Sequence, residues 1–212
     1  MDRSMTDAAA GRTVGPSSRW VSIGWLALGV VWALTLAAGF TELWRYKLRP
    51  GEADGAPAAW PTGSRIPRGQ DRATLVLFAH PQCPCTRASL AELARLMSRF
   101  DGRLSAAVVF IRPASVGGDW DHTDLWQRAS EIPGVTSVRD DDGLEAARFR
   151  ASTSGMAFLY DPQGRLRFSG GITSARGHEG DSVGLQRISS LLRTGTADRP
   201  DAPVFGCSLR HE

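Results

Sequence analysis

Several features that assign a protein to a class are missing from this sequence. Three cysteines in 212 residues are too few for a fold held together by disulfides. The formal charge of +3 is not gathered into a lysine or arginine block, so the sequence does not predict nucleic-acid binding. There is no internal repeat, and Gly170-Gly171 lacks the spacing of a nucleotide-binding loop. An apolar share of 42% with 22% charged residues excludes a disordered chain and a multispan membrane protein.

An apolar run without charged residues, 21–40, lies near the N-terminus. A helix of that length spans about 30 Å, the thickness of the hydrocarbon core of a bilayer. The run is longer than the roughly 7–15 apolar residues of a signal peptide, so we predict an uncleaved anchor. A cleaved signal peptide is the alternative, since Ala37-Ala38-Gly39 supplies small residues. Aromatic residues typical of a membrane interface lie near one end of the run, at Trp20 and Trp25, and just beyond the other, at Trp44 and Tyr46.

Composition divides the rest of the chain. The residues that follow the anchor are rich in proline, glycine and alanine, which is typical of a linker. An ordered loop that docks on the domain around Trp60 and Ile66 is the alternative. The predicted parts are an N-terminal tail at 1–20, the anchor at 21–41, a linker at 42–70, a folded domain at 71–194 and a C-terminal tail at 195–212 that carries Cys207.

Apolar runs alternate with helical patterns along the folded domain. The alternation predicts an α/β sandwich, a central mixed sheet flanked by helices, behind one N-terminal transmembrane helix. A turn at 161–164 joins the last two strands into a hairpin, and Asp181 or Ser182 caps the last helix. The predicted strands are 74–79, 104–111, 135–138, 156–160 and 166–169, and the predicted helices are 86–100, 121–131, 143–149 and one that begins after the cap.

Two of the three cysteines flank a proline between the first strand and the first helix of this domain. Cys83-Pro84-Cys85 falls at the helix N-terminus, where unpaired N–H groups and the helix dipole stabilise a thiolate. A cysteine there has a lowered pKa and is a better nucleophile at neutral pH. Burial in the core is a poor explanation for two cysteines in one turn. We therefore predict a reactive thiol site at Cys83 and Cys85.

Three stretches carry a resemblance to a known family. LVLFAHPQCPCTRASLAEL resembles the thioredoxin-like, membrane-tethered redoxins of bacteria, and HPQCPCTRASLAEL, SGGITSARGHEGD and PVFGCSL are most similar to the group named RedB. The resemblance covers the chain from about Arg65 onward. It implies a thioredoxin-like thiol–disulfide oxidoreductase that needs no organic cofactor, with Cys83 as the attacking thiolate. The implied partners are substrate protein disulfides or thiols and an upstream thiol reductant.

The same resemblance bears on location. Three arginines precede the anchor and three basic residues follow it, so the positive-inside rule gives no orientation. Disulfide chemistry favours an oxidising compartment. We therefore expect a single-pass protein of the bacterial inner membrane with its domain in the periplasm.

The chain departs from the family pattern at two points. When it is aligned through Arg87-Ala88, Thr86 falls on the resolving cysteine of the family, and Cys85 lies one residue earlier. A disulfide between Cys83 and Cys85 would be strained, because side chains two apart on a helix point nearly opposite ways. The resolving thiol is therefore either Cys85 or the distant Cys207. The other departure is Thr153-Ser154-Gly155, which stands where relatives carry a cis-proline facing the active site.

Two other functions remain open. Soft thiolates favour Cu(I), so a copper-binding or copper-delivery module would use Cys83 and Cys85 with His80 or His178. A thiol peroxidase would use Cys83 alone. The remaining candidates have structural interpretations: Arg87 is solvated or near the thiolate, Asp140-Asp141-Asp142 form a turn and helix cap, and His122 and His211 are exposed.

Overall fold

A computed structural model describes residues 16–53 and 55–209 of the chain. The chain divides into two compact units between Tyr46 and Lys47. His211, expected to be exposed, and most of the predicted N-terminal tail lie outside the described residues.

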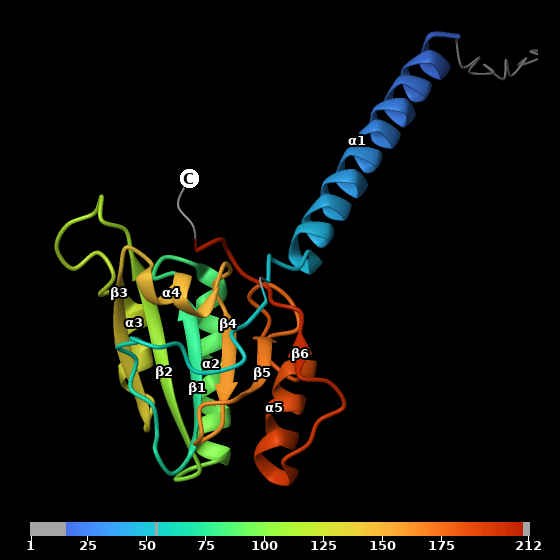
Figure 1. The fold of residues 1–212 in the computed structure, drawn as a ribbon. Coiled ribbons are helices and arrows are strands. Elements are labelled where there is room, and N and C mark those ends of the chain that lie inside the picture. The colour runs from blue at the N-terminus through green and yellow to red at the C-terminus, as the bar shows by residue number, and fades with distance from the viewer. Residues whose placement is uncertain (1–15, 54, 210–212) are drawn as a thin grey trace, which may run out of the picture. The chain divides into compact units, whose positions relative to one another are not determined.

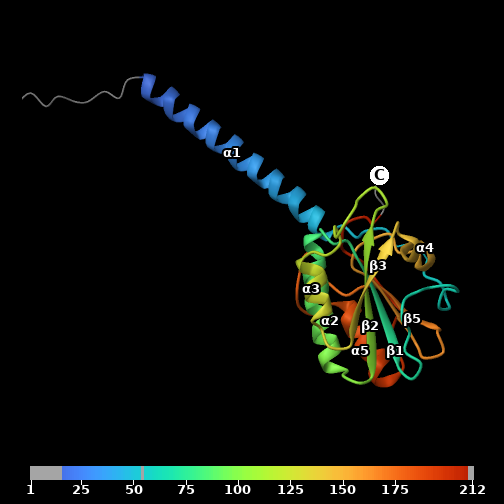
Figure 2. The same ribbon diagram turned by 90° about the vertical axis from the view of Figure 1, so that its left-hand side faces the viewer.

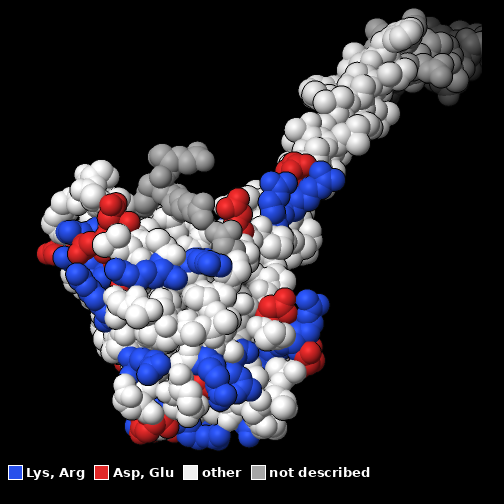
Figure 3. Space-filling view, viewed as in Figure 1, with Lys and Arg blue, Asp and Glu red and all other residues white. Residues whose placement is uncertain are grey.

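The first unit consists largely of one helix, α1 (Pro16–Leu48). Its segment Trp20–Leu48 is long and apolar enough to cross a membrane, and none of it is buried. Charged side chains gather at one end of α1, where Arg45 pairs with Glu42 (Figure 3), and residues 20–41 of the helix include no charged side chain. The helix continues seven residues past the predicted anchor, because no helix-breaking residue occurs before Pro50-Gly51.

The second unit is built on a mixed sheet, as predicted, and the sheet has six strands, one more than the five predicted. The strand order is β3-β2-β1-β4-β5-β6. β1, β2 and β3 run parallel, β4 runs antiparallel to β1 and β5, and β6 runs parallel to β5. The strands are β1 (Ala73–Ala79), β2 (Leu104–Arg112), β3 (Val135–Asp141), β4 (Met156–Tyr160), β5 (Leu166–Gly171) and β6 (Asp201–Ala202).

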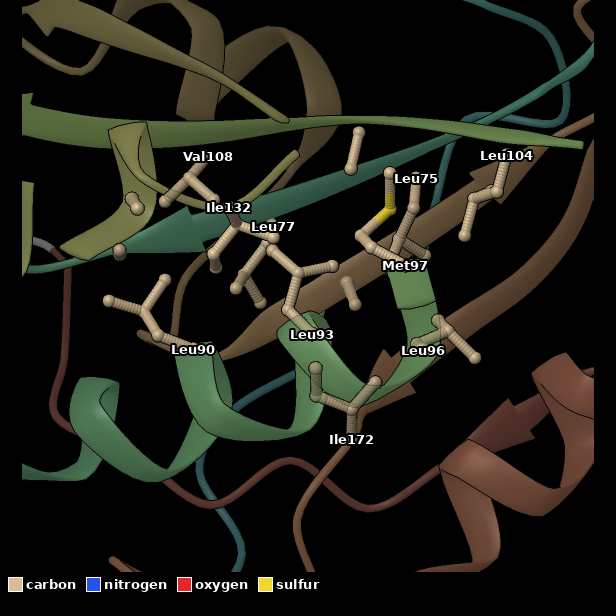
Figure 4. Packing of buried hydrophobic residues seen from close by; sticks show 14 of the residues in the cluster. Leu75, Leu77, Leu90, Leu93, Leu96, Met97, Leu104, Val108, Ile132 and Ile172 are labelled. Carbon is tan, nitrogen blue, oxygen red and sulfur yellow. The ribbon is translucent and has the colours of Figure 1, made fainter. Parts of the chain in front are cut away.

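Helices cover both faces of this sheet (Figures 1 and 2). Alternate residues of β1 point to opposite faces: Leu75 and Leu77 join the core under α2, α3 and α5, whereas Val76 and Phe78 join the core under α4. Figure 4 shows the leucines of α2 packed against β1. The helices are α2 (Pro84–Arg99), α3 (Asp124–Ser130), α4 (Leu144–Phe149) and α5 (Val183–Thr194).

Local capping sets where several helices begin. Pro84 takes the first position of α2, where its missing N–H costs nothing, so the helix starts two residues before the predicted boundary. Ser182, one of the two predicted caps, accepts a hydrogen bond from the N–H of Leu185 at 3.2 Å. The Asp140 carboxylate accepts from the N–H groups of Glu145 and Ala146, which confirms the predicted helix cap there.

The segment predicted as a linker is an ordered loop packed on the domain. Its Trp60 ring meets the rings of Phe149 and Tyr160 edge-on at 5.3 and 5.1 Å, and Ile66 is buried in the same core. The linker prediction is therefore wrong for this stretch, and the docked loop that the sequence left open is correct. The content of proline, glycine and alanine suggested a linker. One large aromatic side chain and one isoleucine nevertheless bury enough apolar surface to hold this loop against the domain.

The segment predicted as a C-terminal tail is also folded onto the domain. Ser169 N–H donates to the Pro200 carbonyl at 2.9 Å beside β6, and the chain then continues along the sheet edge as the red segment of Figure 1. Val204 and Leu209 are each 1% exposed and belong to the core under α4. The position of this segment decides where Cys207 lies.

Packing of α2 on the sheet is expected to dominate the stability of this domain. Leu93 is fully buried between α2 and β1, so Leu93→Ala should lower the free energy of unfolding by about 2–5 kcal/mol. Leu144→Ala is the matched control, since that leucine is 54% exposed. Chemical denaturation of the full chain in detergent measures both changes. Equal small effects for the two variants would contradict the packing described.

Candidate active site

The reactive cysteine lies where the central strand meets α2. β1 ends at Ala79, and after a short turn Cys83 is the residue that caps α2 in extended conformation. Its N–H donates to the His80 carbonyl at 3.1 Å, and its own carbonyl accepts from Thr86 N–H at 3.0 Å. The Cys83 side chain is therefore held at a helix N-terminus, the position that the sequence predicted for it.

None of the three cysteines is in a disulfide, and Cys85 and Cys207 both contact Cys83. The Sγ atoms of Cys83 and Cys207 lie 2.8 Å apart, longer than the roughly 2.05 Å of a disulfide bond. Hydrogen bonds to the Cys83 sulfur, first from the Cys85 side chain and then from Cys207, lower the pKa of Cys83 to about 4 against the opposing effect of burial. At neutral pH Cys83 is therefore a thiolate, although it is only 2% exposed.

The two neighbouring thiols shift in the opposite direction. The pKa of Cys85 is raised, first by its hydrogen bond to Cys83 and then by burial, because losing its proton would leave two negative sulfurs in contact. Burial and the hydrogen bond with Cys83 raise the pKa of Cys207 to about 11. The site therefore holds one thiolate and two protonated thiols.

Arg176 is the site residue that sequence reasoning missed. Its guanidinium donates to the Gly206 carbonyl beside Cys207 and opposes the rise of pKa at both Cys85 and Cys207. It belongs to the stretch SGGITSARGHEGD, which carries part of the family resemblance. That membership was the available signal, because no regular spacing links Arg176 to the cysteines.

The two residues that depart from the family pattern contact one another. Thr86 Oγ1 lies 3.1 Å from Ser154 Oγ and also donates to the His80 carbonyl. Ser154 Oγ in turn accepts from His80 N–H at 3.0 Å. All described peptide bonds are trans. Hydroxyl groups therefore hold together the turn before α2 and the loop before β4.

The copper ligand set is not assembled. Within residues 16–53 and 55–209, no three His, Cys, Asp or Glu side chains form a group that could hold a metal ion. His80 Nδ1 accepts from Gln82 N–H, and its ring packs edge-on against Trp120. His178 is exposed in the loop after β5. Neither histidine lies in a group with Cys83 and Cys85 in the described part of the chain, and copper binding by these residues stays an alternative prediction.

The charged residue nearest to the motif is also part of the surface. Arg87 pairs with Asp124 at 2.7 Å, and both side chains are about half exposed. Arg87 is not one of the main causes of the lowered pKa of Cys83, which are the hydrogen bonds from Cys85 and Cys207 and the opposing effect of burial. Of the two interpretations given for Arg87, the structure supports the solvated one.

Comparison with known proteins shows the fold. No protein-family model and no curated protein matches this chain. The hypothetical protein SMc02350 of Sinorhizobium meliloti 1021 is 18% identical, with a TM-score of 0.56 over 74% of this chain and 95% of that chain. An uncharacterized conserved protein of Geobacillus kaustophilus is also 18% identical, with a TM-score of 0.53 over 78% of this chain and 93% of that chain.

A third solved structure is that of a disulfide oxidoreductase. A secreted Mycobacterium tuberculosis disulfide oxidoreductase, homologous to E. coli DsbE, is 15% identical, with a TM-score of 0.39 over 58% of this chain and 81% of that chain. The thioredoxin-like fold itself follows from the topology: a strand, helix and parallel strand, then a β-hairpin and helix, with sheet order β2-β1-β4-β5 at its centre. The predicted fold class is therefore confirmed.

Proposed function

We propose that this protein is a membrane-anchored thiol–disulfide oxidoreductase related to the RedB redoxins. One observation carries the proposal: Cys83 lies at a helix N-terminus, its pKa is lowered to about 4, and a second thiol, Cys207, lies 2.8 Å from its sulfur. A low-pKa thiol beside a resolving thiol is the arrangement that disulfide exchange requires. α1 supplies a segment long enough to anchor the domain, which we place on the periplasmic side of the inner membrane.

The first chemical step is attack by Cys83. Its thiolate forms a bond to one sulfur of a substrate disulfide, the substrate S–S bond breaks, and the other substrate sulfur leaves as a thiolate that takes up a proton. The product is a mixed disulfide between Cys83 and the substrate. The hydrogen bonds from Cys85 and Cys207 that hold Cys83 ionised are present before substrate arrives.

The second step is resolution by Cys207. Once Cys83 is in a mixed disulfide it carries no charge, so one cause of the raised pKa of Cys207 disappears. Cys207 then loses its proton, attacks Cys83 Sγ and releases the second substrate thiol. Two electrons have passed to the substrate, and the protein holds a Cys83–Cys207 disulfide that an external dithiol protein reduces. No organic cofactor takes part in these steps.

The pH dependence of Cys83 reactivity tests the proposal. Because the pKa of Cys83 is about 4, its alkylation rate by iodoacetamide should stay level from pH 8 to pH 5 and fall to half near pH 4. Mass spectrometry of each cysteine peptide measures the rates. Cys85 is an internal control, since its raised pKa predicts a rate that still climbs at pH 8. A Cys83 rate that climbs tenfold per pH unit up to pH 8 would contradict the proposal.

A further inference from the structure

We propose that the segment Val204–Leu209 is a resident peptide in the substrate-binding edge of this site. It follows that the site accepts extended chains in which glycine immediately precedes the reactive cysteine. This inference rests on the proposed function, because it names the substrate class of the same site. It is carried by the contacts that the segment makes with the loop before β4.

The segment pairs with the domain as an added strand would. Ser208 and Thr153 form an antiparallel bridge. Ser154 N–H donates to the Cys207 carbonyl at 2.8 Å, and Leu209 N–H donates to the Ser152 carbonyl at 2.9 Å. Main-chain hydrogen bonds of this kind fix the register between the segment and the loop before β4 without any contact from side chains. It places the thiol of Cys207 against Cys83 through the backbone alone.

The fit is tightest at the residue before Cys207. A Cβ added to Gly206 would lie 1.8 Å from the Ser154 carbonyl oxygen, a distance that no side chain can occupy. Gly206 is not one of the glycines with a positive φ angle, so the requirement for glycine is steric. Arg176 also donates a hydrogen bond to the Gly206 carbonyl. Any chain held in this register therefore needs glycine at that position.

Side chains on either side of the glycine and cysteine hold the segment in place. Val204 and Leu209 are both buried in the core under α4. The Val204 carbonyl also accepts from Gly51 N–H at 2.8 Å. The pattern that the site accepts is thus an apolar residue, one further residue, Gly-Cys, one further residue and a second apolar residue.

Occupation by this segment explains why the thiolate is buried. Cys83 is only 2% exposed while Cys207 lies against it, so a substrate chain must displace the segment before it reaches the sulfur. When the segment returns, Cys207 meets the mixed disulfide in the register that the substrate used. The same segment therefore excludes chains that bind weakly and later resolves those that have reacted.

The test uses two synthetic peptides, VFGCSL and VFACSL, each with its cysteine joined in a disulfide to 5-thio-2-nitrobenzoate. Attack by Cys83 on the peptide sulfur breaks that bond, forms a Cys83–peptide disulfide and releases coloured thionitrobenzoate. The full-length Cys207→Ser chain is the reference, because it keeps the segment and lacks its thiol. In this background, Gly206→Ala expels the segment and Gly117→Ala is the matched control, since a Cβ there meets nothing within 4 Å.

We expect Gly206→Ala to react with VFGCSL about tenfold faster than the reference. The reason is that the fraction of protein molecules with an unoccupied peptide site rises when the segment leaves. The Gly117→Ala control should match the reference. The Gly206→Ala chain should also prefer VFGCSL over VFACSL by at least about tenfold, the discrimination that one methyl group gives in a tight site. Equal rates for the two peptides, or no acceleration by Gly206→Ala, would overturn the inference.

Two further measurements separate the ways in which this test can fail. The symmetric aromatic disulfide of thionitrobenzoate needs no peptide register, so its reaction with Cys83 reports on the proposed function alone. If it reacts while the peptides show no preference, the resident-peptide inference fails and the function stands. If Gly206→Ala does not fold, Leu209→Ala, which removes one buried anchor of the segment, takes its place with the same expected acceleration.

Discussion

Cys83→Ser is expected to abolish rapid exchange with the symmetric aromatic disulfide, with a loss of about 10³-fold or more in the rate of thionitrobenzoate release. The reason is electrostatic and local. Cys83 is ionised at neutral pH because two thiols donate hydrogen bonds to it at a helix N-terminus, whereas a serine hydroxyl at that position stays protonated. Stopped-flow absorbance of the full chain in detergent measures the fast phase.

The matched control for this variant is Cys85→Ala. It keeps the nucleophile but removes the hydrogen bond that contributes most to lowering the pKa of Cys83. We therefore expect a fast phase that survives, with its pH midpoint moved upward. A fast phase that is retained in Cys83→Ser and lost in Cys85→Ala would show that the attacking thiol is Cys85, and the mechanism would have to be rewritten.

Cys207→Ser is expected to stop the reaction at the mixed disulfide. With the aromatic disulfide in slight excess, the unmodified chain should release two thionitrobenzoate groups in rapid succession, one from each step. Cys207→Ser should release one, because the thiol that remains beside Cys83 is Cys85, and a disulfide between residues two apart at a helix start would be strained. Intact mass measured after the fast phase identifies the trapped adduct.

Cys85→Ala again serves as the control, since it retains Cys207 and should still release two groups. The alternative left open by the sequence makes the reverse prediction. If Cys85 resolves, the Cys85 variant stops after one group and the Cys207 variant proceeds to two. The two single variants thus decide between the resolving thiols.

The fold could be predicted from sequence because its signals are local. The continuous apolar run at 74–79 and the leucine periodicity of 86–100 each specify one element, and their alternation specifies an α/β sandwich. The attacking cysteine was found in the same way, because Cys83 and the start of α2 are adjacent in sequence. The position of Cys83 at the start of this helix was enough to predict that it is the attacking thiol.

The position of the third thiol could not be predicted in this way. Cys83 and Cys207 are 124 residues apart, and their contact depends on how the last residues cross the sheet edge. That path requires close backbone approach at Gly171, where an added Cβ would lie 2.6 Å from the Pro203 carbonyl, and at Gly206. Glycines that admit a neighbouring chain leave no periodic pattern in the sequence, so composition suggested a tail.

Equilibration of the full chain in graded thiol–disulfide buffers, followed by alkylation and mass mapping of the cysteine peptides, tests the central claim most directly. We predict one reversible two-electron transition that joins Cys83 to Cys207 and leaves Cys85 free to alkylate. Three thiols that stay free across the whole range, or a disulfide that joins Cys83 to Cys85, would contradict it.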